Sequence, residues 1–353
     1  MDLAKAVTSV LAGLLAGMAS AQAGTIGVAA PLSGPSELLG RQIEAGASLA
    51  ANANGAALVV ADDACTAEGG RAAAQKFAKA KASTVIGFLC TEAIEAALPI
   101  LKEAGIPVIT VGVRTESLTD QREKTGWSLF RLAARGDDER NAAATILTRL
   151  WRDDLFAVID DGTIYGRELA ETVRATAEQA ALKPAFVDTF RPQMDNQIGL
   201  VGRLRKAGAT KVFVGGDGSD VAIMGRDAQQ LGAAIVFAGG EALRATHGDV
   251  PYATGTLMIA QPEWAEVADK TALDAFAAAE IEPDGYALPA YAAVQIAVAA
   301  EASANGNLDE TLASSDFSTA IGPIRFDKKG DLTQNPYRAY RFDGTRFVPM
   351  ETN

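Results

Sequence analysis

At 353 residues the chain is long for one hydrophobic core, so we expect two domains. Apolar residues make up 48% of it and charged residues 22%, a globular balance that excludes an intrinsically disordered chain. The formal net charge of −12 argues against nucleic acid and against an anionic membrane surface as partners.

The N-terminal segment has the pattern of a secretory signal peptide. Lys5 precedes an apolar run over residues 6–19, and the small-residue motif Ala21-Gln22-Ala23 follows. We therefore expect the chain to be exported, residues 1–23 to be removed and the mature chain to begin at Gly24. A transmembrane anchor is the weaker alternative, because the run is shorter than the ~18 residues that a span needs.

From Thr25 onward, short apolar runs alternate with longer runs of helical periodicity. Thr91 offers a hydroxyl cap to one of the expected helices, which begins at Glu92. In the first run of this alternation we expect strands at 25–30, 58–61 and 108–110 and one starting at 84, with helices at 38–53, 68–81 and 92–104.

The alternation starts again after residue 134. In this second run we expect helices at 137–151, 164–180, 196–207 and 221–231, and strands at 156–160, 186–190, 212–215, 235–238 and 257–260. The final part carries alanine-rich helices at 267–279 and 288–302, then strands at 323–327 and 337–349. Such strand–helix alternation predicts an α/β fold of two doubly wound lobes with parallel sheets, and the terminal strands suggest that the chain crosses back between them.

Two cysteines, Cys65 and Cys90, are the only ones in the chain. In an exported protein such a pair favours one structural disulfide, with two buried free thiols as the alternative. If joined, the cysteines would close a loop of about 25 residues and lock the turn that precedes the helix at Glu92.

Signatures of common enzymes are missing. The sequence has no phosphate-binding P-loop, no G-x-S-x-G elbow and no G-x-G-x-x-G after a strand, and His247 is its only histidine. A Ser–His–Asp system or a Cys/His metal site cannot be built from these residues. We therefore expect no catalytic residue, no cofactor and no metal, although catalysis by carboxylates alone remains an alternative.

Polar residues recur where the expected parallel strands end, which is where open α/β sheets bind ligands. The segments concerned are Ser33, Cys90-Thr91-Glu92, Gly112 to Thr115, Asp161 to Tyr165, Gly216-Asp217 and Gly240-Glu241.

Several motifs together resemble the periplasmic leucine/isoleucine/valine-binding proteins, which are type I solute-binding proteins of ABC importers. They are the opening Gly27 to Pro35, Asp62-Asp63-Ala64-Cys65, Val85 to Cys90, Gly105-Ile106-Pro107, Tyr165-Gly166, Gly215-Gly216 and Tyr291 to Gln295. The resemblance implies two Rossmann-like lobes joined by three crossovers, a ligand cleft between them and a Cys65–Cys90 disulfide. We place one lobe at 24–133 plus 264–336 and the other at 134–263 plus 337–353.

The resemblance also implies ligand contacts. Thr91 and the stretch from Gly112 to Arg114 match positions that hold the ligand's carboxylate, which suits a hydroxyl and free N–H groups at a helix start. Tyr165 matches a tyrosine that covers the ligand, and Glu241 an acid that accepts its ammonium. Ser33, a side-chain pocket position at Leu39, and Asp217 complete the set. The alternatives are structural: a cap for Thr91 or Glu241, core packing for Tyr165 and a solvated loop for Arg114.

Three charged residues depart from the family pattern. Glu92 stands in the first turn of its helix, where it could compete with a ligand carboxylate, and Arg114 could either pair with Glu92 or grip a ligand acid. With Asp217 as a further acid, the cleft is more polar than a pocket for aliphatic side chains. We therefore expect a small polar or charged solute, such as a polar amino acid, an amide or an organic acid.

The resulting hypothesis is a periplasmic, non-enzymatic and monomeric receptor that delivers its solute to the permease of an ABC importer. Its lobes would close about hinges at 132–136, 261–262 and 335–336. A ligand sensor on the same fold and a carboxylate-dependent hydrolase are the alternatives.

Overall fold

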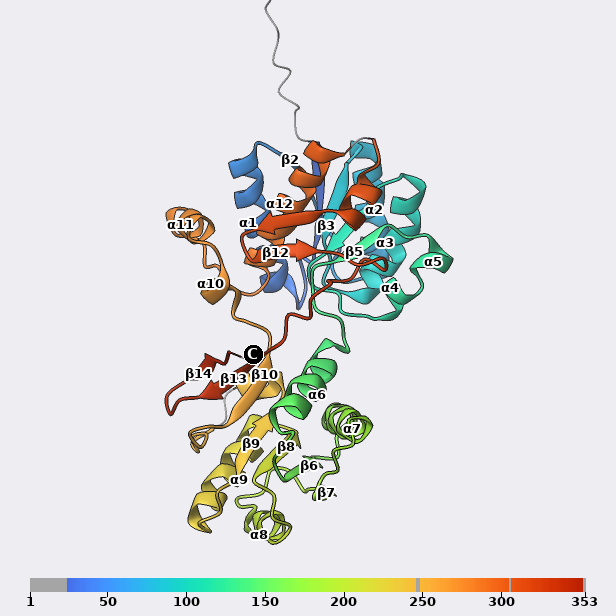
Figure 1. The fold of residues 1–353 in the computed structure, drawn as a ribbon. Coiled ribbons are helices and arrows are strands. Elements are labelled where there is room, and N and C mark those ends of the chain that lie inside the picture. Colours follow the sequence, from blue (N-terminus) through green and yellow to red (C-terminus); the bar gives the residue numbers. More distant parts are fainter. Residues whose placement is uncertain (1–23, 246–247, 305, 352–353) are drawn as a thin grey trace, which may run out of the picture.

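The computed structural model describes residues 24–351 except 246–247 and 305, so the expected signal peptide at 1–23 lies outside the described residues. Two lobes, each built on its own sheet, follow one another along the long axis of the molecule (Figure 1). The first sheet is parallel throughout, with the strand order β2-β1-β3-β4-β5. The α/β fold of two mostly parallel lobes that the sequence predicts is thereby confirmed.

The first lobe contains most of the N-terminal elements and a later C-terminal group. The first part comprises β1 (Thr25–Ala30), α1 (Glu37–Asn54), β2 (Ala57–Asp62), α2 (Ala67–Ala80), β3 (Thr84–Gly87), α3 (Thr91–Glu103), β4 (Val108–Thr110), α4 (Ser117–Asp120), α5 (Arg122–Thr125) and β5 (Leu129–Arg131). The later part comprises α10 (Trp264–Val267), α11 (Lys270–Ala278), α12 (Ala287–Ser303), α13 (Leu308–Ser314) and the antiparallel pair β11 (Asp316–Thr319) and β12 (Gly322–Arg325).

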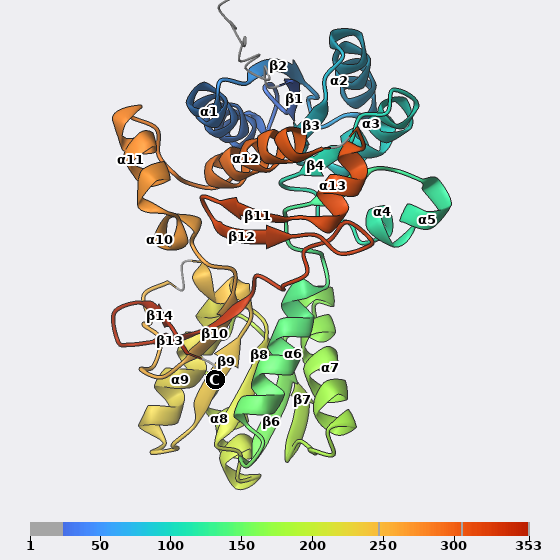
Figure 2. The same ribbon diagram turned by 45° about the horizontal axis from the view of Figure 1, so that its top comes forward.

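The strands of this lobe bury both faces, because successive side chains point to opposite sides of the sheet. Val28 and Ile86 belong to the core under α1 and α12, whereas Ala29 and Val85 belong to the core under α2 and α3. Figure 2 shows α1 beside α12 and α2 beside α3. The two helices α1 and α12 approach closely at Gly46, where an added Cβ would lie 1.9 Å from the carbonyl oxygen of Ala287.

The second lobe contains a seven-stranded sheet in the order β14-β13-β10-β9-β8-β6-β7, in which β13 runs antiparallel to its neighbours β10 and β14 and all other pairs are parallel. Its elements are α6 (Asp138–Leu150), β6 (Phe156–Asp160), α7 (Ile164–Gln179), β7 (Phe186–Thr189), α8 (Ile198–Lys206), β8 (Lys211–Gly215), α9 (Gly218–Gln230), β9 (Val236–Gly239), the 3₁₀ helix η1 (Glu241–Arg244), β10 (Leu257–Ala260), β13 (Arg338–Phe342) and β14 (Phe347–Pro349). Helices α6 and α7 cover one face of the sheet, and α8 and α9 cover the other.

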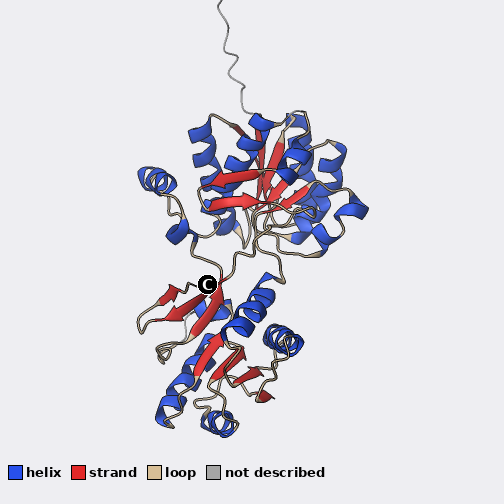
Figure 3. Ribbon diagram, viewed as in Figure 1, coloured by secondary structure: helices blue, strands red, loops and turns tan. Residues whose placement is uncertain are grey.

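Loops join the two lobes (Figure 3). The chain passes between the sheets after β5, after β10 and before β13. The second and third passages return the chain to the first lobe for α10 to β12 and then to the second lobe for β13 and β14.

Two local expectations from the sequence are wrong. Helix α3 begins at Thr91 itself, with Cys90 as the N-cap residue, so the Thr91 hydroxyl does not cap the helix. The helix expected over 267–279 is two helices, α10 and α11. The carboxylate of Asp269 accepts the N–H of Ala272 at 2.8 Å and so caps a new helix at this point.

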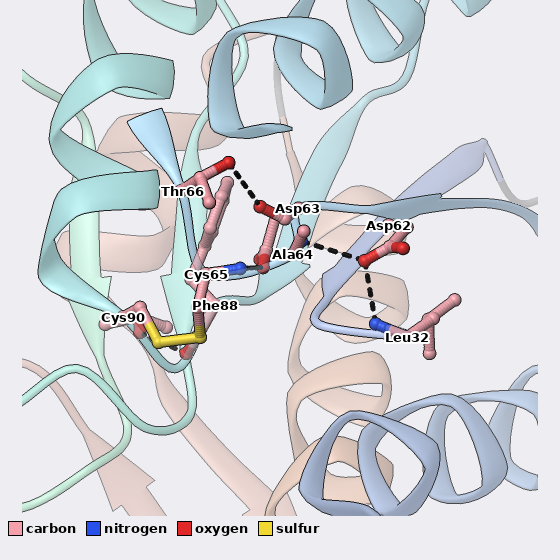
Figure 4. Close-up of a disulfide and its surroundings, with 9 residues drawn as sticks. Leu32, Asp62, Asp63, Ala64, Cys65, Thr66, Phe88 and Cys90 are labelled. Atoms are coloured by element: carbon pink, nitrogen blue, oxygen red, sulfur yellow. Dashed lines mark hydrogen bonds between the residues drawn. A yellow bond between two sulfur atoms is a disulfide. The ribbon is translucent and has the colours of Figure 1, made fainter. Parts of the chain in front are cut away.

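The two cysteines form the disulfide that the family resemblance implies. The Cys65–Cys90 bond joins the loop after β2 to the start of α3, with Cα atoms 5.2 Å apart (Figure 4). The alternative of two free thiols is thereby excluded.

Asp63, two residues before this disulfide, is fully buried. One of its carboxylate oxygens accepts the N–H of Cys65 at 2.9 Å, and the other has no hydrogen-bond partner among the described residues (Figure 4). Burial, and to a lesser extent the charge of Asp62, raises the pKa of Asp63 to about 6.

This pKa predicts a pH-dependent stability. The folded state holds the Asp63 proton more tightly than the unfolded state, whose pKa is about 4. The stability due to protonated Asp63 is therefore present below about pH 4 and is lost as the pH rises through about 6. We expect the unfolding free energy of D63N minus that of the wild type to increase by on the order of 2–3 kcal/mol between pH 4 and pH 7.

Urea denaturation at a series of pH values measures this difference. The same Asp→Asn change at Asp153, which is exposed, controls for the substitution itself. A difference between D63N and the wild type that does not vary with pH would contradict the prediction.

Candidate ligand-binding site between the lobes

Loops from both lobes and one crossover meet in a hydrogen-bonded cluster. Arg114 follows β4 in the first lobe, and Glu241 follows β9 in the second. Tyr337 lies in the last crossover, immediately before β13. The loops converge here because parallel strands end at the same edge of a sheet, and each lobe contributes such an edge.

Arg114 and Glu241 are connected through the hydroxyl of Tyr337. The guanidinium Nη2 of Arg114 donates to Tyr337 Oη at 2.6 Å, and Tyr337 Oη donates to Glu241 Oε2 at 2.9 Å. The guanidinium carbon lies 5.9 Å from the Tyr337 ring centroid. Arg114 thus pairs with Tyr337 and not with Glu92, whose side chain is exposed on α3.

The second lobe adds Glu139, from the first turn of α6. Its Oε1 accepts the Tyr165 hydroxyl at 2.6 Å and the backbone N–H of Glu241 at 2.7 Å. This approach needs Gly240, because a Cβ there would lie 2.3 Å from the same oxygen of Glu139. Burial raises the pKa of Glu139, and burial together with the negative charge of Glu139 raises the pKa of Tyr165.

On the side of the first lobe, two threonines lie together. The hydroxyls of Thr91 and Thr115 are 2.5 Å apart, so Thr91 faces the loop after β4. Gly112 permits this loop to come close, since an added Cβ would lie 2.3 Å from Leu89 Cδ2.

Hollows flank the cluster. One, of about 390 Å³, is lined by Glu241 of the cluster and by Gln261, Trp264 and Glu282. Another, of about 730 Å³, is bordered by Arg114 and Thr115. A small solute therefore has room beside both charged ends of the cluster.

The structure brings together some of the predicted site residues. Arg114, Tyr165 and Glu241 belong to the cluster, and Thr91 and Gly112 adjoin the same loop of the first lobe. Four others form no hydrogen bond or ion pair with this cluster in the part of the chain that the structure describes. They are Ser33, Leu39, Glu92 and Asp217, which lie exposed on the loop after β1, on α1, on α3 and at the start of α9.

Sequence reasoning missed Glu139 and Tyr337, and it placed Thr115 in a candidate segment without assigning it a ligand contact. Glu139 follows Asp137 and Asp138 at a helix start, where acids are ordinary partners of the helix dipole, so no signal distinguishes it. Tyr337 directly follows the crossover predicted at 335–336, and this position was the one available hint that its side chain could reach both lobes.

Among the described residues, no group of three or more His, Cys, Asp or Glu side chains could hold a metal ion. No single described helix has the length and apolarity to cross a membrane, and only the bent pair of α12 and α13 passes that test jointly.

Two α/β lobes with polar side chains gathered between them define a bilobal ligand-binding protein. Comparison with known proteins agrees, because a family model described as periplasmic binding protein matches residues 24–346. The chain belongs to this family, which is one of substrate-binding transport proteins and not of enzymes.

Individual relatives cover nearly the whole chain. An "Amino acid binding protein" of Pseudomonas aeruginosa is 31% identical over 90% of both chains. A "Leucine-, isoleucine-, valine-, threonine-, and alanine-binding protein" of the same organism is 29% identical over 91% of both. The crystal structure of a putative branched-chain amino acid ABC transporter from Rhodospirillum rubrum superposes with a TM-score of 0.76 at 18% identity, covering 93% of this chain and all of that one.

Proposed function

We propose that this protein is the periplasmic substrate-binding component of an ABC transporter, which binds a small polar solute between its lobes and delivers it to a membrane permease. One observation carries the proposal: Arg114 of one lobe and Glu241 of the other meet at a single crossover side chain, beside hollows that can hold a solute. The names of the Pseudomonas aeruginosa relatives, which specify amino-acid binding, support it.

The mechanism is closure of the lobes on the ligand. The proposed lobes are 24–133 plus 264–336 and 134–263 plus 337–353, and they would rotate about hinges at 132–136, 261–262 and 335–336. Ligand that contacts both lobes stabilises the closed form, and the permease would recognise that form. Residues 1–23 would direct the protein to the periplasm, where it would act as a monomer.

The ligand contacts proposed for this site come from both lobes. Thr91, Gly112 and Arg114 would hold an anionic group, because hydroxyls, backbone N–H groups and a guanidinium are all donors. Tyr165 and Glu241 would act from the second lobe. The other four predicted contacts are exposed and would reach the ligand only when the lobes close. They are Ser33, Leu39, Glu92 and Asp217.

The charges of the cluster favour a polar ligand. Burial of Arg114, Glu139 and Glu241 beside an aliphatic side chain would leave charged groups without water or a polar partner, which is costly. We therefore propose a polar amino acid, an amide or an organic acid, in contrast to the mainly aliphatic amino acids for which one relative is named.

Native mass spectrometry of the protein purified from the periplasm tests the proposal. We expect a stoichiometric small molecule that is released on denaturation, that raises the melting temperature when added back, and that reduces the radius of gyration in solution scattering. Stabilisation by leucine, isoleucine and valine alone would contradict the polar ligand. A protein that neither carries nor binds any solute of a broad panel would contradict the transport function.

A further inference from the structure

Among the described residues, Tyr337 is the one side chain that is hydrogen-bonded to both Arg114 and Glu241. Its hydroxyl accepts from the guanidinium of Arg114 and donates to the carboxylate of Glu241, and its exposed fraction is only 4%. Gln261 Nε2, from another crossover, lies 3.5 Å from the same hydroxyl. Within the described part of the chain, Arg114 and Glu241 meet through this hydroxyl and form no direct ion pair.

The interposed hydroxyl leaves Arg114 only partly satisfied. A guanidinium has five N–H donors, and Arg114 uses Nη2 on Tyr337. Its Nε is buried and has no hydrogen-bond partner among the described residues. An unpaired buried donor is unfavourable, so this geometry favours an acceptor arriving from outside the chain.

Glu241 also accepts hydrogen bonds without forming an ion pair among the described residues. Its Oε2 accepts from Tyr337, and its Oε1 accepts the backbone N–H of Gln261 at the long distance of 3.3 Å. Both partners are uncharged, so the carboxylate remains open to a cationic group. A direct contact with Arg114 would cancel both charges at once, because a close guanidinium–carboxylate pair is the strongest hydrogen-bonded arrangement open to either group.

Resting on the solute-binding function proposed above, we propose that Tyr337 is a specificity-determining positioning residue. Its hydroxyl separates Arg114 from Glu241 and so keeps an anion-binding and a cation-binding group available to one ligand that carries both charges.

The phenylalanine variant separates this role from packing. Y337F keeps the buried ring but removes the hydroxyl, so Arg114 and Glu241 are free to form a direct ion pair. The ligand must then break that pair to use both groups, whereas a ligand with a single charge depends on only one of them. We therefore expect the loss of affinity to depend on the ligand's charges.

The binding experiment uses titration calorimetry with the twenty proteinogenic amino acids as probes. For the tightest binder, two analogues follow: one that lacks the α-ammonium group and one whose carboxylate is converted to an amide. Y337F should lower the affinity for the intact amino acid by about tenfold or more, as expected for lost hydrogen bonds to charged groups. It should lower the affinity for each analogue by no more than about threefold. Y291F, a matched change at a buried tyrosine of α12, should leave all three affinities unchanged.

Two results of this experiment would overturn the inference. One is an amino-acid affinity in Y337F within about threefold of the wild type. The other is an equal loss for all three ligands, which is the result expected if Tyr337 only maintains the fold.

A second experiment needs no ligand. Urea denaturation of R114M, E241Q and the double variant gives the coupling between Arg114 and Glu241, first in the wild-type background and then in Y337F. The coupling should be clearly larger in the Y337F background, and equal couplings in the two backgrounds would overturn the inference. If no amino acid binds to the wild type, the doubly charged ligand is ruled out, and if no solute of a broad panel binds, the proposed function fails. In either case this coupling still decides whether Tyr337 separates Arg114 from Glu241.

Discussion

Replacing Asp331 by alanine is expected to lower the free energy of unfolding by about 3–5 kcal/mol. Asp331 Oδ1 accepts from Nε of Arg131 at 2.7 Å, and the exposed fractions of the two side chains are 4% and 0%. Its other oxygen accepts from Thr119 at 2.8 Å and from Arg135 at 2.7 Å. Without Asp331, the Arg131 guanidinium would stay buried with no charged partner in contact, which is the main cost of breaking a buried pair.

The loop that carries Arg114 depends on the same network. Arg131 also donates to the carbonyl oxygens of Val113 and Thr115, at 2.9 and 2.8 Å, on either side of Arg114. Asp331 holds Arg131 in place, so D331A should also weaken solute binding through the loss of a fixed position for Arg114.

Urea denaturation measures the stability change, with D274A as the matched control. Asp274 pairs with Lys270 at 2.7 Å, but the side chains are 65% and 86% exposed. Loss of this exposed pair should cost less than about 0.5 kcal/mol. Equal effects of D331A and D274A would show that the buried network contributes no more than a surface pair.

Removing the disulfide in C65A/C90A is expected to lower the free energy of unfolding by about 3–4 kcal/mol. The cysteines are 25 residues apart, and the bond restricts the unfolded chain by closing that loop. It also joins the loop after β2 to the residue that precedes Thr91, so its loss should increase the mobility of the start of α3.

The wild type under reducing conditions provides the control for this variant, because its sequence is unchanged and only the bond is lost. Denaturation curves of the reduced wild type and of C65A/C90A should agree, and both should fall below that of the oxidised wild type. A change of less than about 1 kcal/mol in both would indicate that the loop is already ordered in the unfolded chain.

Much of the fold could be predicted from the sequence because its signals are local. Apolar runs bounded by Gly, Pro and Asp predicted most strands of the two sheets, as at 25–30 and 156–160, which match β1 and β6, but they did not predict β5. The prediction was weaker where capping competes with periodicity. Asp269 interrupts an alanine-rich run and begins a new helix, and α13 and β11 carried no pattern strong enough to predict them.

The candidate site could be predicted only in part. Arg114 and Glu241 were found because they follow strands, a position that the chain order defines. Their partner Tyr337 could not be assigned, because Arg114 and Tyr337 are 223 residues apart and meet only where a crossover passes between the lobes. Glu139 was missed because acids are common at helix starts and because it meets the backbone of Glu241 across 102 residues.

The sequence by itself determined the α/β class, most of the order of the strands and helices, and the family, because these depend on local periodicity and on short motifs. Only the tertiary structure decided which charged side chains meet. Arg114 could have paired with Glu92, a neighbour by topology, yet its guanidinium lies against Tyr337. The choice between such partners depends on side-chain directions and on the path of the crossovers, and these are fixed only when both lobes are packed.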